Sequence, residues 1–357
     1  MTTIMIMAGG TGGHVFPALA VAEVLTQRGV TVIWMGTAKG IEARLVPEAG
    51  YPLTKISVQG LRGNGAMGWV TAPFKLVKAV IEAIAALKKN KTDLVLGLGG
   101  FASGPGGVAA WLLRKPVVIH EQNAIPGLTN TLLAGLASRV LQGFPNSFKV
   151  SKHAEWVGNP VRGSIAALAN PVQKQRTEQG FNVLVLGGSL GAKSLNETLP
   201  AAIALIGQAR SLRVKHQCGQ KHLEDCQSHY QRANVHAEVT AFIGDMAAAY
   251  DWADIVVCRA GALTIAEISA AGVPSILVPY PYAVDDHQRH NASALLAVGA
   301  AVLIDESELT AQKLADNIIE LASSNNTLFT MAKAARTQAK PEAAVTIADI
   351  CMAVNHG

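Results

Sequence analysis

The sequence has little charge, few aromatic side chains and few cysteines for its length. Charged residues make up 15% of its 357 residues and hydrophobic residues 50%, a balance that excludes a largely disordered chain. Aromatic residues make up 5%, too few for a platform on which single-stranded nucleic acid would stack. The net charge of +5 is not clustered with aromatic residues, so nucleic acid is not an expected partner.

The four cysteines form no C-x-x-C pair, so neither a zinc site nor a thioredoxin-like site is expected. They fit buried small side chains in a reducing compartment. Long hydrophobic runs are also absent. The best window, residues 69–87, contains Pro73 and three charged residues, and so falls short of the ~20 apolar residues that span a membrane. The N-terminus lacks the basic segment of a signal peptide, which predicts a buried strand there and a cytoplasmic location.

The sequence does contain an internal repeat of one pattern. Residues 4–13 (IMIMAGGTGG) and 183–191 (VLVLGGSLG) are apolar runs that end in glycine-rich turns, and an amphipathic stretch follows each. A fully apolar strand, a tight turn and a helix begin a parallel sheet that is covered on both faces. Two such beginnings predict an α/β protein with two Rossmann-like, doubly wound domains. We place these domains at residues 1–160 and 161–340, and expect residues 342–357 to form a helix that packs back on the first.

Three glycine-rich loops, at residues 9–14, 97–105 and 187–191, are candidate anion sites. Glycine lets backbone N–H groups converge, and a following helix N-terminus favours a phosphate. A tight strand–helix turn would explain any single loop, but two of the three lie at equivalent places in the repeat. There is no G-x-x-x-x-G-K-[ST] motif, and Val15 replaces the third glycine of a G-x-G-x-x-G fingerprint. NTP hydrolysis and nicotinamide binding are therefore not indicated.

The segment RAGALTIAE, residues 259–267, follows a predicted strand and opens a helix. A carboxylate early in a helix can simply complement the helix dipole. The helix of Glu267, however, begins at a glycine turn, where ligands approach. One carboxylate can accept hydrogen bonds from both hydroxyls of a ribose, so Glu267 is a candidate for binding a nucleotide sugar.

Seven motifs, in order from residue 9 to residue 292, resemble the MurG family of peripheral-membrane glycosyltransferases. They are GGTGGH, GGFASGP, HEQN at 120–123, GNPVR at 158–162, GGSLGA, RAGALTIAE and DDHQRHNA at 285–292. The resemblance implies a GT-B fold, in which two Rossmann-like domains face each other across a cleft. It also implies transfer of N-acetylglucosamine, with inversion, from UDP-GlcNAc to the 4-hydroxyl of undecaprenyl-diphospho-MurNAc-pentapeptide (lipid I). The product would be lipid II, for peptidoglycan synthesis.

The resemblance further implies which residues bind the substrates. Ser189 would contact a phosphate of UDP-GlcNAc, Ile243 the uracil through its backbone, and Glu267 the ribose. Gln288 would contact the sugar hydroxyls, and Asn291 would shape the sugar pocket. The other implied donor residues are Thr11, Gly12, Gly13, Asn123, Arg162, Ala262, Leu263, Thr264, Ile265 and Ala266. The acceptor would lie near His14, the HEQN segment, Gly99, Gly100, Phe101 and Gly104, and at position 101 some relatives have a tyrosine hydroxyl that this chain lacks.

The transfer needs groups that stabilise the charge on the departing UDP. The chain has no D-x-D motif, and the adjacent Asp285 and Asp286 are better explained by loop solvation or by orientation of Gln288. We therefore expect no metal and no other cofactor. Helix N-termini after the glycine loops would act instead, with Arg162 or Arg259 as substrate-binding residues.

The transfer also needs a base for the acceptor hydroxyl. His14 closes the first glycine loop at the end of a predicted strand, where the site of a Rossmann-like domain lies. An imidazole can take a proton from a sugar hydroxyl near neutral pH, which makes His14 the leading candidate. A helix N-cap or a phosphate donor are its alternative roles, and His120 and Glu121 are the rival bases.

Residues 60–115 carry a charge of +6, against +5 for the whole chain. Within this segment Phe74, Val77, Val80, Ile81 and Ile84 recur at helical spacing beside Lys75 and Lys78, and Trp69 and Trp111 add large apolar groups. A helix with its apolar face on the sheet would explain the stripe, whereas an anionic membrane surface would explain both the stripe and the charge. We expect peripheral attachment to the cytoplasmic face of the inner membrane. The resemblance adds other cell-wall synthesis and division proteins as partners.

Two other functions stay open at this stage. A UDP-GlcNAc 2-epimerase shares the architecture and the donor, but needs acid–base residues beside the sugar and no lipid-facing surface. A non-catalytic UDP-sugar-binding protein would need only the donor site. Turnover of UDP-GlcNAc with and without an acceptor distinguishes all three.

Overall fold

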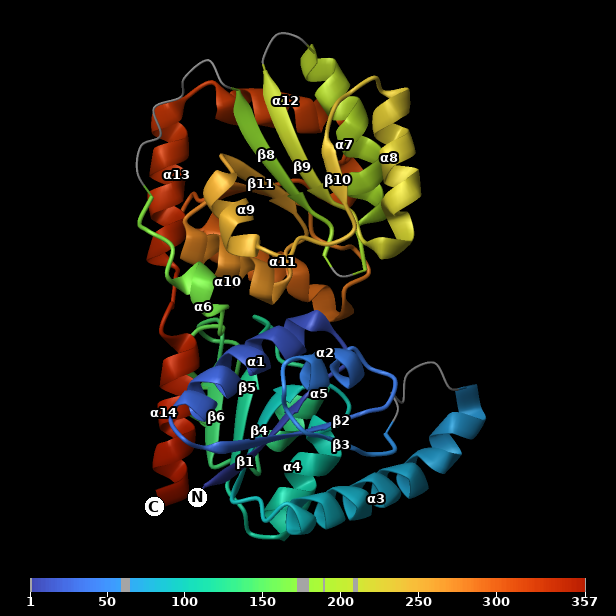
Figure 1. The fold of residues 1–357 in the computed structure, drawn as a ribbon, viewed down its shortest axis with the longest axis vertical. Helices are drawn as coiled ribbons and strands as arrows, with labels where there is room; N and C mark the ends of the chain where they lie inside the picture. The colour runs from blue at the N-terminus through green and yellow to red at the C-terminus, as the bar shows by residue number, and fades with distance from the viewer. Residues whose placement is uncertain (1, 59–64, 172–179, 189, 208–210, 357) are drawn as a thin grey trace. The chain divides into compact units, whose positions relative to one another are not determined.

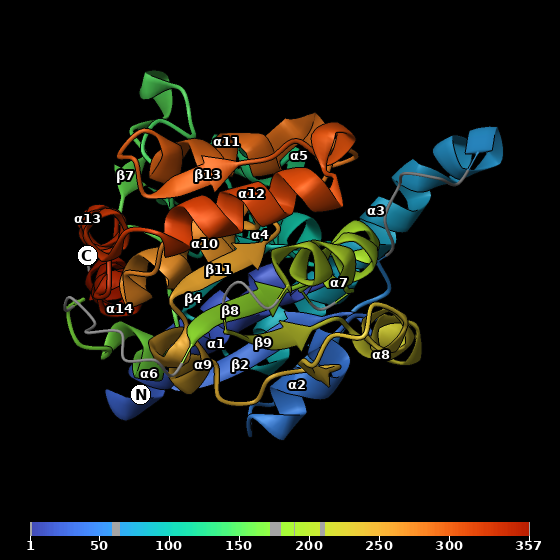
Figure 2. The ribbon, with the colours of Figure 1, turned by 90° about the horizontal axis from the view of Figure 1, so that it is seen from above.

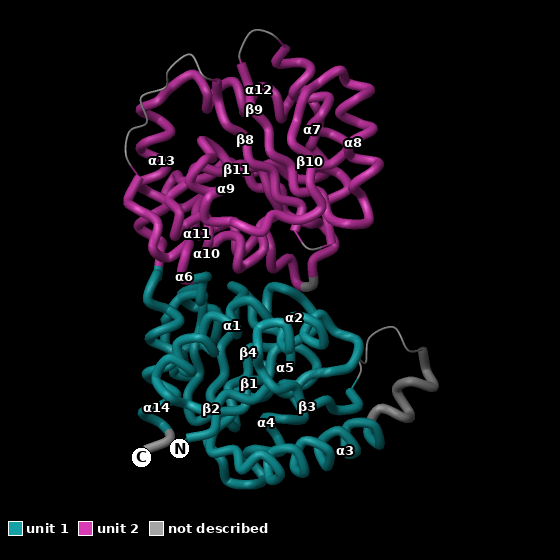
Figure 3. The backbone as a smooth tube through the Cα atoms, viewed as in Figure 1, with its two compact units in different colours: residues 1–162, 340–357 teal, residues 163–339 magenta. Residues whose placement is uncertain are grey.

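The computed structural model describes residues 2–58, 65–171, 180–188, 190–207 and 211–356. The chain divides into two compact units (Figure 3). Unit 1 comprises residues 1–162 and 340–357, and unit 2 comprises residues 163–339. The boundary lies two residues beyond position 160, and the C-terminal segment belongs to unit 1.

Unit 1 is built on a seven-stranded, wholly parallel sheet with the strand order β3-β2-β1-β4-β5-β6-β7. Strand β1, in the interior of the sheet, is buried along nearly its whole length, as its unbroken apolar run predicts. The order reverses between β1 and β4, so the loops that follow these two strands lie beside each other. The strands are β1 Thr3–Ala8, β2 Thr31–Gly36, β3 Leu53–Lys55, β4 Leu94–Gly99, β5 Val117–Glu121, β6 Arg139–Gln142 and β7 Glu155–Trp156.

Helices cover both faces of this sheet. Helices α1 and α14 share one hydrophobic core with β1 and β4 and lie side by side (Figure 1). Helices α3, α4 and α5 pack over the core on the opposite face. The helical segments are α1 Gly12–Gln27, α2 Glu42–Glu48, α3 Gly65–Lys89, α4 Ser103–Leu112, α5 Leu128–Leu133, η1 Val150–Lys152 and α14 Ala343–His356.

Unit 2 repeats the plan with six parallel strands in the order β10-β9-β8-β11-β12-β13, and this order reverses between β8 and β11. The strands are β8 Phe181–Leu186, β9 Leu212–Gln217, β10 Glu238–Thr240, β11 Ile255–Cys258, β12 Ser275–Leu277 and β13 Ala301–Leu303. Helices α7 and α12 pack against each other over one face of this sheet (Figure 2). The helical segments are α6 Gly163–Ala166, α7 Lys193–Ile206, η3 Gln220–His222, α8 Leu223–Arg232, α9 Met246–Trp252, α10 Ala262–Ala271, η4 Val284–Asp286, α11 His287–Leu296, η5 Glu306–Glu308, α12 Ala311–Ala322 and α13 Asn325–Thr337.

The predicted fold class, two doubly wound parallel domains, is confirmed. The two halves of the internal repeat are β1–α1 and β8–α7, at the reversal point of each sheet. Along the described residues, no helix is long and apolar enough to cross a membrane.

Candidate functional site

The first glycine loop joins β1 to α1 at the carboxyl end of the sheet. Gly10 has a φ of +86°, a conformation that side chains rarely adopt, and Thr11 follows as the exposed N-cap of α1. Gly12 and Gly13 are the first helical residues, so their N–H groups have no acceptor within the helix. The loop thus presents donors at a helix N-terminus, as the sequence predicts for an anion site.

The loop after β4 packs directly on the first glycine loop. A Cβ on Gly100 would lie 2.5 Å from the carbonyl oxygen of Gly9, and a Cβ on Gly99 would lie 2.8 Å from the ring of His14. Gly99 and Gly100 therefore allow a close approach of backbone and ring, a packing role. Phe101 is exposed, and Gly104 lies within α4, where a Cβ would only touch Thr129.

Glu42 supports the first glycine loop from beneath, a role that no sequence motif predicted. Its buried carboxylate accepts hydrogen bonds from the N–H of Gly10 at 2.9 Å and from the N–H and hydroxyl of Thr37 at 3.0 and 2.8 Å. Burial alone would raise the pKa of Glu42, but these three donors outweigh it and hold the pKa below the usual 4.5. One donor of the glycine loop, the N–H of Gly10, is therefore already used by the protein.

His14 lies in the first turn of α1 and is joined to the HEQN segment at the end of β5. Its Nδ1 is 2.7 Å from Oε1 of Gln122. The amide nitrogen of Gln122 is 3.0 Å from Nδ1 of His120, whose Nε2 is 2.8 Å from the carbonyl oxygen of Gly158. Three segments of unit 1, namely α1, the HEQN segment and the turn at Gly158, thus converge on one hydrogen-bonded chain that ends at His14.

The two rival bases are placed less favourably than His14. His120 is fully buried, and burial lowers its pKa to about 4. The buried carboxylate of Glu121 accepts hydrogen bonds from the N–H and side chain of Asn123, from the N–H of Gly127 and from the side chain of Asn130. Glu121 therefore orders the turn between β5 and α5, and its carboxylate oxygens are engaged in hydrogen bonds with that turn. The same hydrogen bonds position Asn123.

Arg162 ends unit 1, and its guanidinium lies 5.7 Å from the ring centroid of Phe16 on α1. This contact places a cation beside the helix that carries His14. The predicted roles of Arg162 and Asn123 in donor binding stay predictions.

In unit 2 the second glycine loop joins β8 to α7. The N–H of Gly188 donates to Oε1 of Gln217 at 3.1 Å, and Nε2 of Gln217 donates back to the carbonyl oxygen of Gly188 at 3.0 Å. Gln217, at the end of β9, thus clamps this loop as Glu42 supports the first. Ser189, the predicted phosphate contact, lies outside the described residues.

The RAGALTIAE segment opens α10 after β11, on the other side of the reversal point. The first three helical residues, Ala262, Leu263 and Thr264, have N–H groups without acceptors in the helix, whereas Ile265 and Ala266 continue it. Ala262 has no polar side-chain group, so it can offer only its backbone N–H to a ligand, whereas the N–H of Ile265 already donates to the carbonyl oxygen of Gly261. The segment therefore presents helix N–H donors to a ligand.

Glu267, in the second turn of α10, is only 4% exposed. Its carboxylate accepts a hydrogen bond from the hydroxyl of Tyr250 on α9, 3.0 Å away. Tyr250 thus orients the predicted ribose-binding carboxylate. No sequence motif pointed to Tyr250, because its partner lies 17 residues away on another helix.

The remaining predicted donor residues of unit 2 lie in segments that follow the strands β10 and β12. Oε1 of Gln288 accepts the N–H of Tyr280 at 2.9 Å, an arrangement that fixes the orientation of the Gln288 amide. Asn291 is buried and donates to the carbonyl oxygen of Ala260. Ile243 is half-buried in the segment between β10 and α9.

The guanidinium of Arg259 forms an ion pair and hydrogen bonds with other groups of the protein. Its guanidinium pairs with Glu306, donates to the carbonyl oxygens of Val278 and Pro279, and donates to the hydroxyl of Ser194 at 2.9 Å. These contacts tie the end of β11 to the N-terminus of α7. The predicted role of Arg259 in substrate binding stays a prediction.

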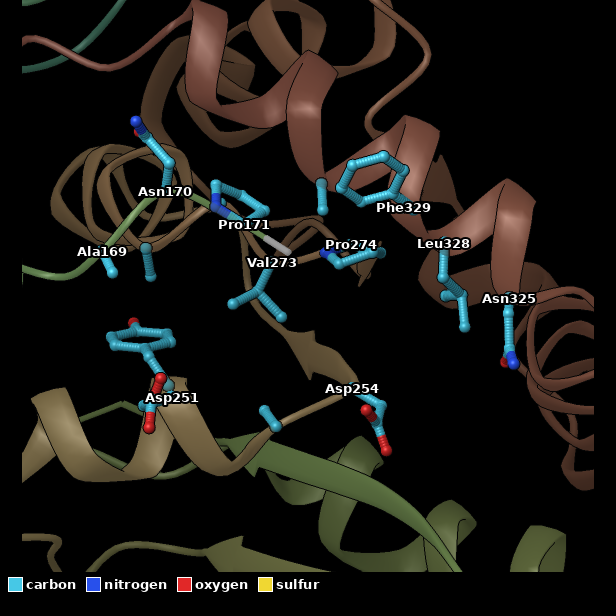
Figure 4. Close-up of a pocket in the computed structure, with 15 residues that line it drawn as sticks. Ala169, Asn170, Pro171, Asp251, Asp254, Val273, Pro274, Asn325, Leu328 and Phe329 are labelled. Carbon is cyan, nitrogen blue, oxygen red and sulfur yellow. The ribbon is translucent and has the colours of Figure 1, made fainter. Parts of the chain in front are cut away.

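A separate pocket of about 170 Å³ lies in unit 2 (Figure 4). Asp254, Val273 and Pro274, which line it, precede β11 and β12, so the pocket is at the amino ends of the strands. The motifs lie at the carboxyl ends, where ligands of doubly wound sheets bind. This pocket is therefore not the candidate donor site.

The apolar side chains of the predicted membrane-facing stripe on α3 fall into a group that packs on the core and a group that is exposed. Val80 and Ile84 pack on the core beneath the helix, together with buried Ala83 and Leu87. Phe74, Val77 and Ile81 are instead 79%, 59% and 61% exposed. Lys75 and Lys78 are exposed beside them, and so is Trp111 of the neighbouring helix α4, whereas the side chain of Trp69 lies outside the described part of the chain.

Two family models together match most of the chain. Residues 4–142 match the glycosyltransferase family 28 N-terminal domain, and residues 182–347 match the C-terminal domain of that family. The chain is 53% identical, over 99% of each chain, to the UDP-N-acetylglucosamine--N-acetylmuramyl-(pentapeptide) pyrophosphoryl-undecaprenol N-acetylglucosamine transferase of Nitrosococcus oceani. It is 52% identical to the protein of the same name from Aeromonas hydrophila, over 98% of this chain and 96% of that one.

One solved structure supports the same family relationship, and a second one shares the fold. The crystal structure of Acinetobacter baumannii MurG superposes with a TM-score of 0.84 at 42% identity, over 99% of this chain and 100% of that chain. A Listeria monocytogenes protein assigned as a UDP-N-acetylglucosamine 2-epimerase superposes with a TM-score of 0.69 at 13% identity, over 97% and 94% of the two chains. The second likeness extends to the fold alone.

Proposed function

Since the chain belongs to glycosyltransferase family 28, we infer that it is a UDP-GlcNAc-dependent N-acetylglucosaminyltransferase. It transfers N-acetylglucosamine, with inversion, from UDP-GlcNAc to the 4-hydroxyl of the lipid I sugar, and so forms lipid II for peptidoglycan. The observation that carries this conclusion is identity of about half of all residues to N-acetylglucosamine transferases along the whole chain. The 2-epimerase alternative has support from the fold alone.

We propose that unit 2 binds the donor at the carboxyl ends of β8 and β11. The N-termini of α7 and α10 point donors at the diphosphate, and Glu267, oriented by Tyr250, accepts the ribose hydroxyls. The Gln288 oxygen is occupied by a backbone N–H, so its amide nitrogen is the group that faces the sugar as a donor.

We propose that His14 is the general base. Its Nε2 takes the proton of the acceptor 4-hydroxyl as that oxygen forms a bond to C1 of N-acetylglucosamine, and the bond from C1 to the diphosphate breaks. The electron pair of that bond leaves with UDP. Helix N-termini stabilise the new charge without reorganising, so we propose that the reaction needs no metal.

We propose that α3 and α4 attach unit 1 peripherally to the cytoplasmic face of the inner membrane. The proposal is supported by the exposed Phe74, Val77, Ile81 and Trp111, which lie on neighbouring helices, and by the exposed Lys75 and Lys78. Helices α3 and α4 cover one face of the sheet, so their exposed side chains can enter one interface together. Other cell-wall synthesis and division proteins are further expected partners.

Turnover of UDP-GlcNAc with and without a short-chain lipid I analogue tests the function. The transferase releases UDP only when the acceptor is present. Conversion of UDP-GlcNAc alone to its 2-epimer would show an epimerase, and no turnover in either condition would show a binding protein.

A further inference from the structure

In the hydrogen-bonded chain from His14 through Gln122 and His120 to the carbonyl oxygen of Gly158, each residue donates to the next one, beginning at His14. We propose that Gln122 and His120 are positioning residues that hold the His14 imidazole in the tautomer with its proton on Nδ1, so that Nε2 is the proton acceptor. This inference rests on the proposed role of His14 as the base. It explains why a glutamine and a buried histidine lie behind that residue.

The orientation of the Gln122 amide follows from its surroundings. Its nitrogen is 3.0 Å from the backbone carbonyl oxygen of His120, a group that can only accept a hydrogen bond. The nitrogen of the amide must therefore be on that side, and the oxygen must face His14. Since that oxygen can only accept, and lies 2.7 Å from Nδ1 of His14, the proton of the neutral ring is on Nδ1.

The hydrogen bonds of His120, at the other end of the hydrogen-bonded chain, independently indicate the same direction of donation. Nε2 of His120 is 2.8 Å from the carbonyl oxygen of Gly158, which again can only accept, so Nε2 of His120 carries a proton. Nδ1 of His120 is then an acceptor, and it receives the second N–H of the Gln122 amide at 3.0 Å. Burial lowers the pKa of His120 to about 4, so this ring stays neutral near pH 7 and the direction does not reverse.

The surroundings of His14 fix the ring as well as the proton. Gly99, with a φ of +105°, brings backbone so close to the ring that a Cβ there would lie 2.8 Å from it. Gln122 and His120 are themselves almost completely buried. Among the described residues, no hydrogen bond is formed to Nε2 of His14, which leaves that atom for the acceptor hydroxyl.

Nitrogen NMR of the wild-type protein labelled on histidine tests the tautomer directly. The ring signals of His14, one of 10 histidines, are identified by their loss in His14→Gln. We expect a protonated Nδ1 and an unprotonated Nε2 for the neutral ring. A proton on Nε2 of His14 would overturn the proposal, whatever the activity of the protein.

Gln122→Met, which removes both ends of the amide, tests the consequence for the reaction. We expect a mixture of His14 tautomers and a kcat lowered by about 10- to 100-fold, less than the loss on removing a general base, with the KM for UDP-GlcNAc within about twofold of wild type. Gln142→Met is the matched control, because Gln142 is also buried at a strand end and hydrogen-bonds to backbone groups of Ala154 and Phe148. It should keep kcat.

A folded Gln122→Met protein with kcat within about threefold of wild type would also overturn the proposal. If Gln122→Met does not fold, the wild-type spectrum alone decides. Failure of the wild-type protein to transfer N-acetylglucosamine would contradict the proposed function instead, and would leave the tautomer measurement valid.

Discussion

The carboxylate of Glu42 accepts the backbone N–H of Gly10 at 2.9 Å. The amide oxygen of Gln217 accepts the N–H of Gly188, the equivalent glycine of the internal repeat, at 3.1 Å. In both loops the second glycine is therefore held by a side chain, and donors for a ligand come from the first turn of the helix that follows. The support in unit 2 is neutral, so it adds no negative charge beside the diphosphate that we place there.

Glu42→Gln should lower the free energy of unfolding by about 1.5–3 kcal/mol near neutral pH, because it weakens three hydrogen bonds to a buried carboxylate. The folded-state pKa of Glu42 lies below 4.5, so its contribution is present above that pH and is lost as pH falls through the folded-state pKa. Urea unfolding at a series of pH values should show the difference from wild type shrinking below about pH 4.5. Glu48→Gln, on the exposed end of α2, is the control and should change little. A difference that does not depend on pH would contradict the assignment.

His14→Ala should lower kcat by about 10²- to 10⁴-fold with little change in the KM for UDP-GlcNAc, because a base acts in the transition state. Steady-state kinetics with a lipid I analogue measure both constants. If the main effect is a higher KM for the donor, His14 is a phosphate donor instead. A kcat within about threefold of wild type would make Glu121 the next base to test.

Glu267→Ala should weaken UDP binding by roughly 2–3 kcal/mol, the scale of charge-assisted hydrogen bonds. Tyr250→Phe should weaken it by about 0.5–1.5 kcal/mol, because it removes one hydrogen bond that orients Glu267. Tyr282→Phe, at an exposed position, is the control. Calorimetric titration with UDP measures all three, and unaltered affinity in Glu267→Ala would reject the ribose assignment.

The double variant Lys75→Glu with Lys78→Glu should release the protein from anionic vesicles while UDP affinity stays the same, since each basic residue near anionic lipid contributes about 1 kcal/mol. Lys221→Glu with Arg232→Glu makes the same change in net charge on unit 2 and serves as the control. Vesicle sedimentation measures binding. Equal sedimentation of both double variants and wild type would count against the proposed membrane face.

Transfer should continue nearly unchanged in excess EDTA, because we assign stabilisation of the departing UDP to helix N-termini. The initial rate of transfer is measured before and after EDTA is added. In the control, EDTA is removed and Mg²⁺ or Mn²⁺ is added back. Complete loss of activity that either ion restores would refute metal independence.

The sequence predicted the central fold because each repeat contains a run of four apolar residues (residues 4–7 and 183–186), then a glycine-rich turn, and then a helix. The edge strands β3, β7 and β10 were not predicted, because two or three residues carry no periodic pattern. On α3, helical spacing grouped Val80 with Phe74, although one packs on the sheet and the other is exposed. Spacing alone does not say which part of a broad apolar stripe meets the sheet.

The candidate site was predictable where its groups are local. Glycine loops and the first turns of their helices are contiguous in sequence, so motifs reveal them. Glu42, Gln217 and Tyr250 support those motifs from other elements, and tertiary packing alone brings them there. The contacts of Arg259 with Glu306 and Ser194 were likewise not predictable from its motif, because these partners lie on distant segments of the chain.

Helix α14 completes the core of unit 1, yet it follows the whole of unit 2 along the chain. During synthesis, unit 2 is a continuous segment that can fold as soon as it has left the ribosome. Unit 1 must wait with the α1 side of its sheet uncovered, because the buried Ile347, Ala348 and Cys351 arrive last. The domain that begins the chain is therefore the last to be finished.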